Sequence, residues 1–205
     1  MHQAFIYLFD NLQSLGADFL EKNLNKLPLI RQEHCKKYQN DFDKKARVIA
    51  YLLLEKGLKE QYKITRPVSF IYSDLQKPYL KETPHIFFNV SHCKSGVACA
   101  IAEFELGIDI QDSFKFDIKF ARKVCTGAEI KNLEESENPE KLFIRFWTEK
   151  ESYAKAKGIN VSDVFQKSLS GGFFYSQQND NYCVTLCHMG LLETKNIYTI
   201  KENTM

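Results

Sequence analysis

Hydrophobic and polar positions follow a strand-like pattern in several short stretches of the chain. The first stretch is residues 4–9 (AFIYLF), and further β-rich runs are separated by short polar or glycine-containing turns, which favours a largely antiparallel set of strands. Residues 173–178 and 181–188, joined through Asn179-Asp180, are typical of a hairpin, and residues 197–200 predict a last strand. The remaining runs are residues 68–72 (VSFIY), 85–92 (HIFFNVSH), 96–104 (GVACAIAEF) and 106–112 (LGIDIQD).

A helical period replaces this pattern in two parts of the chain. From about Asp41, apolar residues recur every three or four positions, and Gly57 is a plausible stop. After residue 112 the pattern predicts a helix over 116–125, a second opened by Thr126, and a long one over 138–157. Asn138-Pro139 is a helix-start signal, and the glycine at 158 is a natural stop. No linker rich in Pro, Gly or Ser separates the two halves, so we expect two α+β lobes that share one interface.

Composition excludes several classes of protein. A net charge of +2 is too small for bulk nucleic-acid binding, and no apolar run approaches membrane-spanning length. The first residues lack the features of a secretion signal, so we expect a cytoplasmic protein whose six cysteines are reduced and mostly buried. The spacing of Cys183, Cys187 and His188 could suggest zinc, but the alternation within YCVTLCH favours a strand.

Positive charge is clustered in an early segment of the chain, so an anionic ligand could bind there. A solvated helix face is the other interpretation, and charge alone favours it. The cluster consists of Arg31, His34, Lys36, Lys37, Lys44, Lys45 and Arg47.

Two later segments carry candidate chemistry. In the strand 106–112, alternation turns Ile108 and Ile110 to the core and places Asp109 and Gln111 together on the other face. The same pattern is also common in half-exposed strands with a polar outer face.

In the helix over 138–157, residues four apart share a face, so the row that begins with Phe143 and Trp147 continues to Glu151 and Lys155. An inward-facing glutamate needs a cation. An exposed Glu151–Lys155 ion pair is the alternative interpretation.

The segments FNVSH, GIDIQD and FWTEKESYAKAKG occur in this order, and together they resemble the phosphopantetheinyl transferases of the surfactin-synthetase type. The resemblance covers most of residues 25–160. It implies an α+β fold of two similar, pseudo-symmetric lobes, residues 1–105 and 106–205, each with a helix packed on a mainly antiparallel sheet and with the active site between them. It also implies a monomer, because shorter relatives with a single lobe assemble their sites between subunits.

By this resemblance, Asp109 and Glu151 would bind Mg²⁺, with Gln111 where most relatives carry glutamate, and Lys155 would contact the reacting phosphate. Glu129 matches a glutamate near the metal-bound water or the incoming serine. Thr126-x-x-Glu129 is, however, also a capping-box sequence.

Further positions match the family's contacts to coenzyme A. His92 corresponds to a histidine that contacts phosphate, and Lys77 belongs to a Lys-Pro element of the nucleotide pocket, although it could be an ordinary turn lysine. The implied coenzyme A contacts are Arg31, His34, Arg47, Lys77, Pro78, Ser91 and His92.

The activity implied is Mg²⁺-dependent transfer of phosphopantetheine from coenzyme A to a serine of an apo acyl or peptidyl carrier protein, with release of adenosine bisphosphate. A non-catalytic module that binds coenzyme A or a carrier protein is the alternative, and Gln111 is the feature that favours it. An unrelated phosphate-binding enzyme ranks lower, because no Walker or dinucleotide glycine motif is present.

Overall fold

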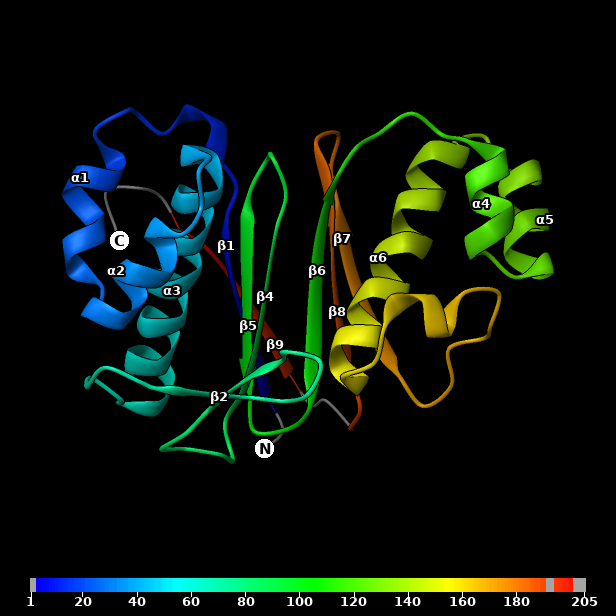
Figure 1. The fold of residues 1–205 in the computed structure, drawn as a ribbon. Coiled ribbons are helices and arrows are strands. Elements are labelled where there is room, and N and C mark those ends of the chain that lie inside the picture. Colours follow the sequence, from blue (N-terminus) through cyan, green and yellow to red (C-terminus); the bar gives the residue numbers. More distant parts are fainter. Residues whose placement is uncertain (1–2, 191–193, 201–205) are drawn as a thin grey trace.

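The computed structural model describes residues 3–190 and 194–200. Two β-sheets pack face to face in the middle of the molecule, and helices cover the outer face of each (Figure 1). The layers are therefore helix, sheet, sheet and helix, which confirms the predicted α+β class.

The two halves of the chain repeat one order of elements: a strand, a long helix, and a pair of antiparallel strands. This repetition agrees with the expected similarity of the halves. The first half contains β1 (Gln3–Phe9), α1 (Phe19–Asn23), α2 (Leu29–Lys36), α3 (Asp41–Tyr62), β2 (Phe70–Tyr72), β3 (Pro78–Leu80), β4 (Phe87–His92) and β5 (Val97–Ala102), with 3₁₀ turns at Leu12–Ser14 and Leu24–Lys26. The second half contains β6 (Leu106–Asp112), α4 (Ile118–Val124), α5 (Gly127–Glu135), α6 (Pro139–Lys157), a 3₁₀ turn at Val161–Val164, β7 (Phe173–Gln178), β8 (Tyr182–His188) and β9 (Thr194–Thr199).

The strands form a four-stranded sheet in the order β4-β5-β1-β9, a three-stranded sheet in the order β6-β8-β7, and a small β2-β3 ribbon. All pairings are antiparallel except that of β9, which runs parallel to β1. The sequence boundary at residue 105 assigned this last strand to the second lobe. In the structure it instead completes the sheet of the first half.

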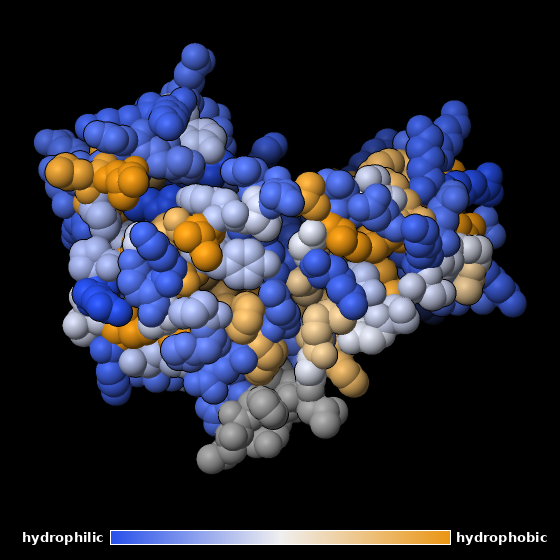
Figure 2. All heavy atoms as spheres, turned by 60° about the horizontal axis from the view of Figure 1, so that its bottom comes forward, coloured by the Kyte–Doolittle hydropathy of each residue, from blue (hydrophilic) through white to orange (hydrophobic). Residues whose placement is uncertain are grey.

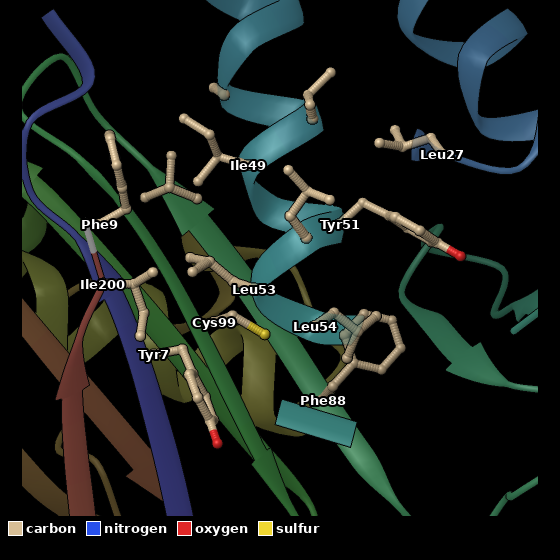
Figure 3. Packing of buried hydrophobic residues seen from close by; sticks show 14 of the residues in the cluster. Tyr7, Phe9, Leu27, Ile49, Tyr51, Leu53, Leu54, Phe88, Cys99 and Ile200 are labelled. Atoms are coloured by element: carbon tan, nitrogen blue, oxygen red, sulfur yellow. The ribbon is translucent and has the colours of Figure 1, made fainter. Parts of the chain in front are cut away.

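The inner face of α3 packs on the four-stranded sheet and forms the largest core. Ile49 and Leu53 from the helix meet Tyr7 of β1 and Cys99 of β5 (Figure 3). The opposite face of this sheet carries Ala98 and other small residues, which pack on the apolar face of β6 and β8. Small side chains here allow the two sheets to approach closely.

Gly57 does not end α3, contrary to the sequence prediction. The helix continues to Tyr62, and Lys63 closes it in the left-handed conformation, with φ of 58°. Gly57 is buried, and a Cβ at this position would overlap Ile101 Cδ1 and Tyr7. This glycine therefore serves close packing of helix on sheet rather than termination.

Helix α6 begins and ends where its sequence signals predicted. The Asn138 side chain accepts a hydrogen bond from the Lys141 amide, Pro139 occupies the first helical position, and Gly158 ends the helix with φ of 64°. This helix covers the outer face of the second sheet (Figure 1).

All six cysteines are buried and free, as predicted. Burial, together with the nearby Asp112 carboxylate, raises the pKa of Cys93 to about 12. Cys183, Cys187 and His188 lie on β8, which confirms the strand interpretation of this segment. Within 3–190 and 194–200, no group of three or more His, Cys, Asp or Glu residues is arranged to hold a metal ion.

The surface is mainly polar on the face that Figure 2 shows, where hydrophobic residues form separate patches. Among the residues that the structure describes, Leu29 and Ile30 of α2 are the most exposed large apolar ones, at 77% and 73%. Within the described part of the chain, no helix is long and apolar enough to cross a membrane.

Candidate functional site

Asp109 of β6, which is buried, and Lys155 of α6, which is partly exposed, form an ion pair at the centre of the candidate site. Lys155 Nζ lies 2.6 Å from Asp109 Oδ1 and also donates to Ser91 Oγ at 3.1 Å. The Ser91 hydroxyl in turn donates to Asp109 Oδ1 at 2.8 Å. The structure thus brings together three residues that the sequence assigned to one site, and they come from β4, β6 and α6.

The strand register of β6 creates this arrangement. Ile108 and Ile110 lie in the core between the two sheets, as predicted, which turns Asp109 toward α6. Gly107 allows the helix to approach, because a Cβ at Gly107 would lie 2.5 Å from the Ala156 backbone nitrogen and would overlap the Ser152 carbonyl. Asn89 fixes β6 from the other side by accepting a hydrogen bond from the Ile108 amide at 2.9 Å.

Glu151 lies one turn before Lys155 on the same face of α6 and is half-buried. Burial raises the pKa of Glu151, the Lys155 charge opposes this shift, and the Asp109 charge adds to it. The two carboxylates therefore share one electrostatic environment. This agrees with the sequence expectation that Glu151 faces inward near a cation.

The Asp109 carboxylate meets a simple test for cation binding. The Asp109 side chain is only 7% exposed. Its Oδ2 atom is buried and has no hydrogen-bond partner among the described residues. An unpartnered buried carboxylate oxygen is costly and suits a hard cation such as Mg²⁺. The described residues offer fewer than three acidic, His or Cys ligands at this place, so water or substrate oxygens would have to complete the coordination.

Gln111 is half-buried in β6 and lies two residues beyond Asp109, hence on the same face of the strand. Its main chain pairs with Cys183 of β8. The predicted register, which placed Asp109 and Gln111 on one face, therefore agrees with the structure.

His92, at the end of β4, connects this centre with the basic helix α3. Removal from water lowers the pKa of His92, Arg47 and Lys155 lower it further, and Asp43 and Asp109 oppose them. The imidazole thus lies within electrostatic reach of both the α3 residues and the Asp109–Lys155 pair.

A cleft of about 450 Å³ lies between α2, α3 and the β2-β3 ribbon. Arg31, His34, Arg47 and Pro78 line it, and the sequence assigned all four to nucleotide binding. The Arg31 guanidinium stacks on the Phe70 ring at 3.8 Å. This cleft combines positive charge with aromatic surface, which is suited to a phosphorylated, planar ligand.

One buried polar atom in the cleft, Arg47 Nε, lacks a hydrogen-bond partner in the described part of the chain. The Arg47 guanidinium stacks on the Tyr38 ring at 3.7 Å. Buried donors without partners are rare in native proteins, so this atom marks a surface suited to a polar ligand.

Lys77 does not extend into this cleft with its neighbour Pro78. Its side chain is buried, and Nζ lies 2.6 Å from Glu105 Oε2 and 3.0 Å from the Ala156 carbonyl. Lys77 therefore joins the β3 segment to the last turn of α6. A direct contact with nucleotide, which the resemblance implied, would require this ammonium to leave two existing partners.

Glu129 lies in the capping box that its sequence also allowed. Its Oε2 atom accepts from the Thr126 amide at 2.7 Å, while Thr126 Oγ1 accepts from the Glu129 amide. The same carboxylate pairs with the Lys150 ammonium at 3.0 Å. Because Glu129 Oε1 also accepts from Lys150 Nζ at 3.1 Å, Glu129 anchors α5 to α6 with both carboxylate oxygens.

Sequence reasoning missed three residues that organise the site. Lys150 is fully buried against Glu129, although it sits in a charged stretch where exposure is the ordinary expectation. Asn89 holds β4 to β6, and its position in FNVSH was the signal that could have identified it.

Asp112 is the third missed residue. Its carboxylate accepts hydrogen bonds from the amides of Lys94 at 2.7 Å and Ser95 at 2.9 Å. Although partial burial raises the pKa of Asp112, hydrogen bonds from Ser95, Cys93 and these amides outweigh burial and lower it. Asp112 therefore attaches the turn after His92 to the end of β6.

Comparisons with known proteins agree with this geometry. A family model described as the 4'-phosphopantetheinyl transferase superfamily matches residues 105–188, which include β6, α6 and β8. The chain is 24% identical over 151 residues to 4'-phosphopantetheinyl transferase Sfp of Bacillus subtilis (strain 168), covering 72% of this chain and 67% of that protein. It is 31% identical over 161 residues to 4'-phosphopantetheinyl transferase gsp of Aneurinibacillus migulanus, covering 77% and 66%. The chain thus aligns with about two thirds of the length of each relative.

Proposed function

Because the chain belongs to the 4'-phosphopantetheinyl transferase superfamily, we propose that it transfers phosphopantetheine from coenzyme A to a serine of an apo acyl or peptidyl carrier protein. The reaction would depend on Mg²⁺ and release adenosine bisphosphate. The observation that carries this proposal is the pairing of the buried Asp109 carboxylate, one oxygen of which has no partner among the described residues, with Lys155 beside a basic cleft.

Asp109 and Glu151 are the residues we assign to Mg²⁺, with Gln111 as a further oxygen donor. When bound, Mg²⁺ supplies positive charge that offsets the charge of the pyrophosphate and of the leaving phosphate. The carboxylates act by holding that charge at a fixed place on β6 and α6, two elements that are packed together through Gly107.

Lys155 provides the second positive charge of the reaction centre. In our proposal the serine oxygen attacks the phosphorus that carries the pantetheine arm, a new oxygen–phosphorus bond forms, and the pyrophosphate bond to adenosine bisphosphate breaks. The Lys155 ammonium stabilises the negative charge that develops on the phosphate oxygens.

In our proposal a carboxylate accepts the proton of the serine, and Glu151, which is also assigned to Mg²⁺, would do so through water. Glu151 is the better candidate, because it lies within electrostatic reach of Asp109 and Lys155, whereas Glu129 is engaged by Thr126 and Lys150. The sequence left both glutamates open for this role. The contacts of Glu129 now favour a structural one for it.

The adenosine bisphosphate end of coenzyme A is assigned to the basic cleft. Arg31 and Arg47 would pair with phosphate, and Phe70 and Tyr38, on which these guanidinium groups stack, keep them oriented. His92, between the cleft and Asp109, would contact a phosphate on the path from one to the other.

Transfer and simple binding can be separated by product release. We expect adenosine bisphosphate to appear by liquid chromatography only when protein, coenzyme A, Mg²⁺ and apo carrier protein are combined. A non-catalytic binding module would bind coenzyme A, for example in calorimetry, without releasing this product. That outcome would replace the transferase proposal with the binding alternative.

Gln111 gives a specific prediction about the metal requirement. Its amide oxygen can bind Mg²⁺ but supplies no negative charge, so Gln111→Glu should strengthen the attraction for the cation. We expect the Mg²⁺ concentration for half-maximal activity to fall by roughly threefold to tenfold, with little change in rate at saturating Mg²⁺. Measuring initial rates of transfer across a Mg²⁺ titration tests this.

Gln177→Glu is the matched control, because Gln177 is exposed on β7 of the same sheet. It should leave the Mg²⁺ dependence unchanged. If Gln111→Glu also left it unchanged, Gln111 would not face the metal.

A further inference from the structure

The Asp109 carboxylate already holds a cationic partner in the protein alone. Lys155 Nζ lies 2.6 Å from Oδ1, and the Ser91 hydroxyl donates to the same oxygen, while Oδ2 is buried without a partner. One carboxylate oxygen is therefore occupied, and the other has no partner among the described residues. A metal ion that used Asp109 would arrive next to the Lys155 ammonium.

Lys155 and a divalent cation cannot both rest on Asp109 without strong repulsion. Like charges a few ångströms apart repel strongly where water is largely excluded, and the Asp109 side chain is only 7% exposed. Asp109 and Glu151 bring two carboxyl groups to this place, and the Lys155 ammonium compensates the charge of Asp109. The Lys155 ammonium thus weakens the electrostatic attraction of this site for a metal ion.

The Lys155 ammonium can move away from Asp109 toward solvent, which would relieve this repulsion. The Lys155 side chain is 28% exposed and lies in the last turn of α6, so its ammonium can turn toward solvent without leaving a buried charge behind. The Ser91 hydroxyl stays as a donor to Asp109 after the ammonium leaves, because it belongs to the neighbouring strand β4.

On the basis of the proposed function, we propose that Lys155 is the resident counter-ion of Asp109 and that divalent metal binding displaces its ammonium from the carboxylate. The displaced ammonium is then available to phosphate. The metal ion and coenzyme A should therefore each increase the affinity of the protein for the other. The metal ion separates Lys155 from Asp109, and the phosphates of coenzyme A then give Lys155 a new partner.

Metal affinity of the free protein tests this exchange without any transfer assay. Mn²⁺ is the probe, because its free concentration can be read from its electron paramagnetic resonance signal. In the absence of coenzyme A, Lys155→Met should lower the Kd for Mn²⁺ by about tenfold or more, since the competing charge is gone. Lys155→Arg, which keeps the charge, should bind Mn²⁺ about as weakly as the wild type.

Lys157→Met is the matched control, since it removes the same charge from the same turn of α6. Its ammonium is exposed and lies 5.7 Å from the Tyr153 ring centre. The affinity for Mn²⁺ should change little in this variant. An unchanged or weaker affinity in Lys155→Met, or an equal gain in Lys157→Met, would overturn the proposal.

A measurement on the wild-type protein decides the matter if Lys155→Met does not fold. Lysine labelled with ¹³C at Cε reports the surroundings of each ammonium by nuclear magnetic resonance, and the Lys155 signal is the one missing in Lys155→Arg. Mg²⁺ should shift this signal toward that of an exposed lysine. A Lys155 signal that stays in place while Mg²⁺ binds would refute displacement.

These measurements remain interpretable if the transferase proposal fails. Metal binding and the Lys155 signal are recorded with neither coenzyme A nor carrier protein present. A protein without transferase activity that still shows tighter Mn²⁺ binding in Lys155→Met would retain the exchange, whereas an active protein without that effect would lack it.

Discussion

Asp109→Asn should reduce phosphopantetheine transfer by on the order of a hundredfold or more while the protein stays folded. Asparagine has nearly the shape of aspartate and can still accept the Ser91 hydrogen bond, but it removes the negative charge that would hold Mg²⁺. Alanine is a poorer test, because Asp109 is only 5% exposed and its removal would also leave a cavity. The initial rate at saturating coenzyme A and a thermal unfolding curve together measure the effect.

Asp180→Asn serves as the control for this substitution. Asp180 is exposed and forms a surface ion pair with Lys141, so the variant should keep full activity. Asp109→Asn with near wild-type turnover at high Mg²⁺ would contradict the assignment of Asp109 as a metal ligand.

Gly107→Ala should destabilise the protein by about 3 kcal/mol, because the added methyl group forces β6 and α6 apart. A Cβ at Gly107 would overlap the Ser152 carbonyl and lie 2.5 Å from the Ala156 nitrogen. Backbone atoms cannot move aside as a side chain end can, so the helix that carries Lys155 must shift. Denaturant unfolding followed by circular dichroism gives the change in the free energy of unfolding.

Gly127→Ala is the matched control, since nothing lies within 4 Å of a Cβ at Gly127. Gly127 is the first residue of α5, where alanine favours the helix, so this variant should be neutral or more stable by about 0.5 kcal/mol. Equal stability of Gly107→Ala and the wild type would show that α6 does not depend on this close approach.

The elements of the second half could be predicted because their signals are local. Asn138-Pro139 and Gly158 bound α6, and Asn179-Asp180 connects the hairpin of β7 and β8. A helix cap or a turn depends on a few neighbouring residues, so the sequence alone is sufficient for it. Alternation along β6 predicted in the same way which side chains face α6.

Other features depended on contacts between distant segments. Gly57 resembles a helix stop in sequence, and only the nearby Ile101 and Tyr7 show why glycine is required inside α3. The pairing of β9 with β1 likewise links the two ends of the chain, and no local pattern reveals which edge a strand will join.

In the candidate site, too, some features could be predicted from local sequence and others depend on contacts between distant segments. The motifs predicted that Asp109, Glu151 and Lys155 belong together, and the structure brings them together. The partners of Lys77 and Glu129, which are Glu105 and Lys150, come from tertiary packing and could not be read from the motifs. Their contacts leave the proposed chemistry to Asp109, Glu151 and Lys155.

Intact-mass spectrometry of an apo carrier protein tests the central claim most directly. After incubation with the protein, coenzyme A and Mg²⁺, the carrier should gain the mass of one phosphopantetheine group. A carrier whose acceptor serine is replaced by alanine should gain nothing. If none of several apo carriers gained mass from a folded protein that binds coenzyme A, the proposed transfer reaction would be wrong.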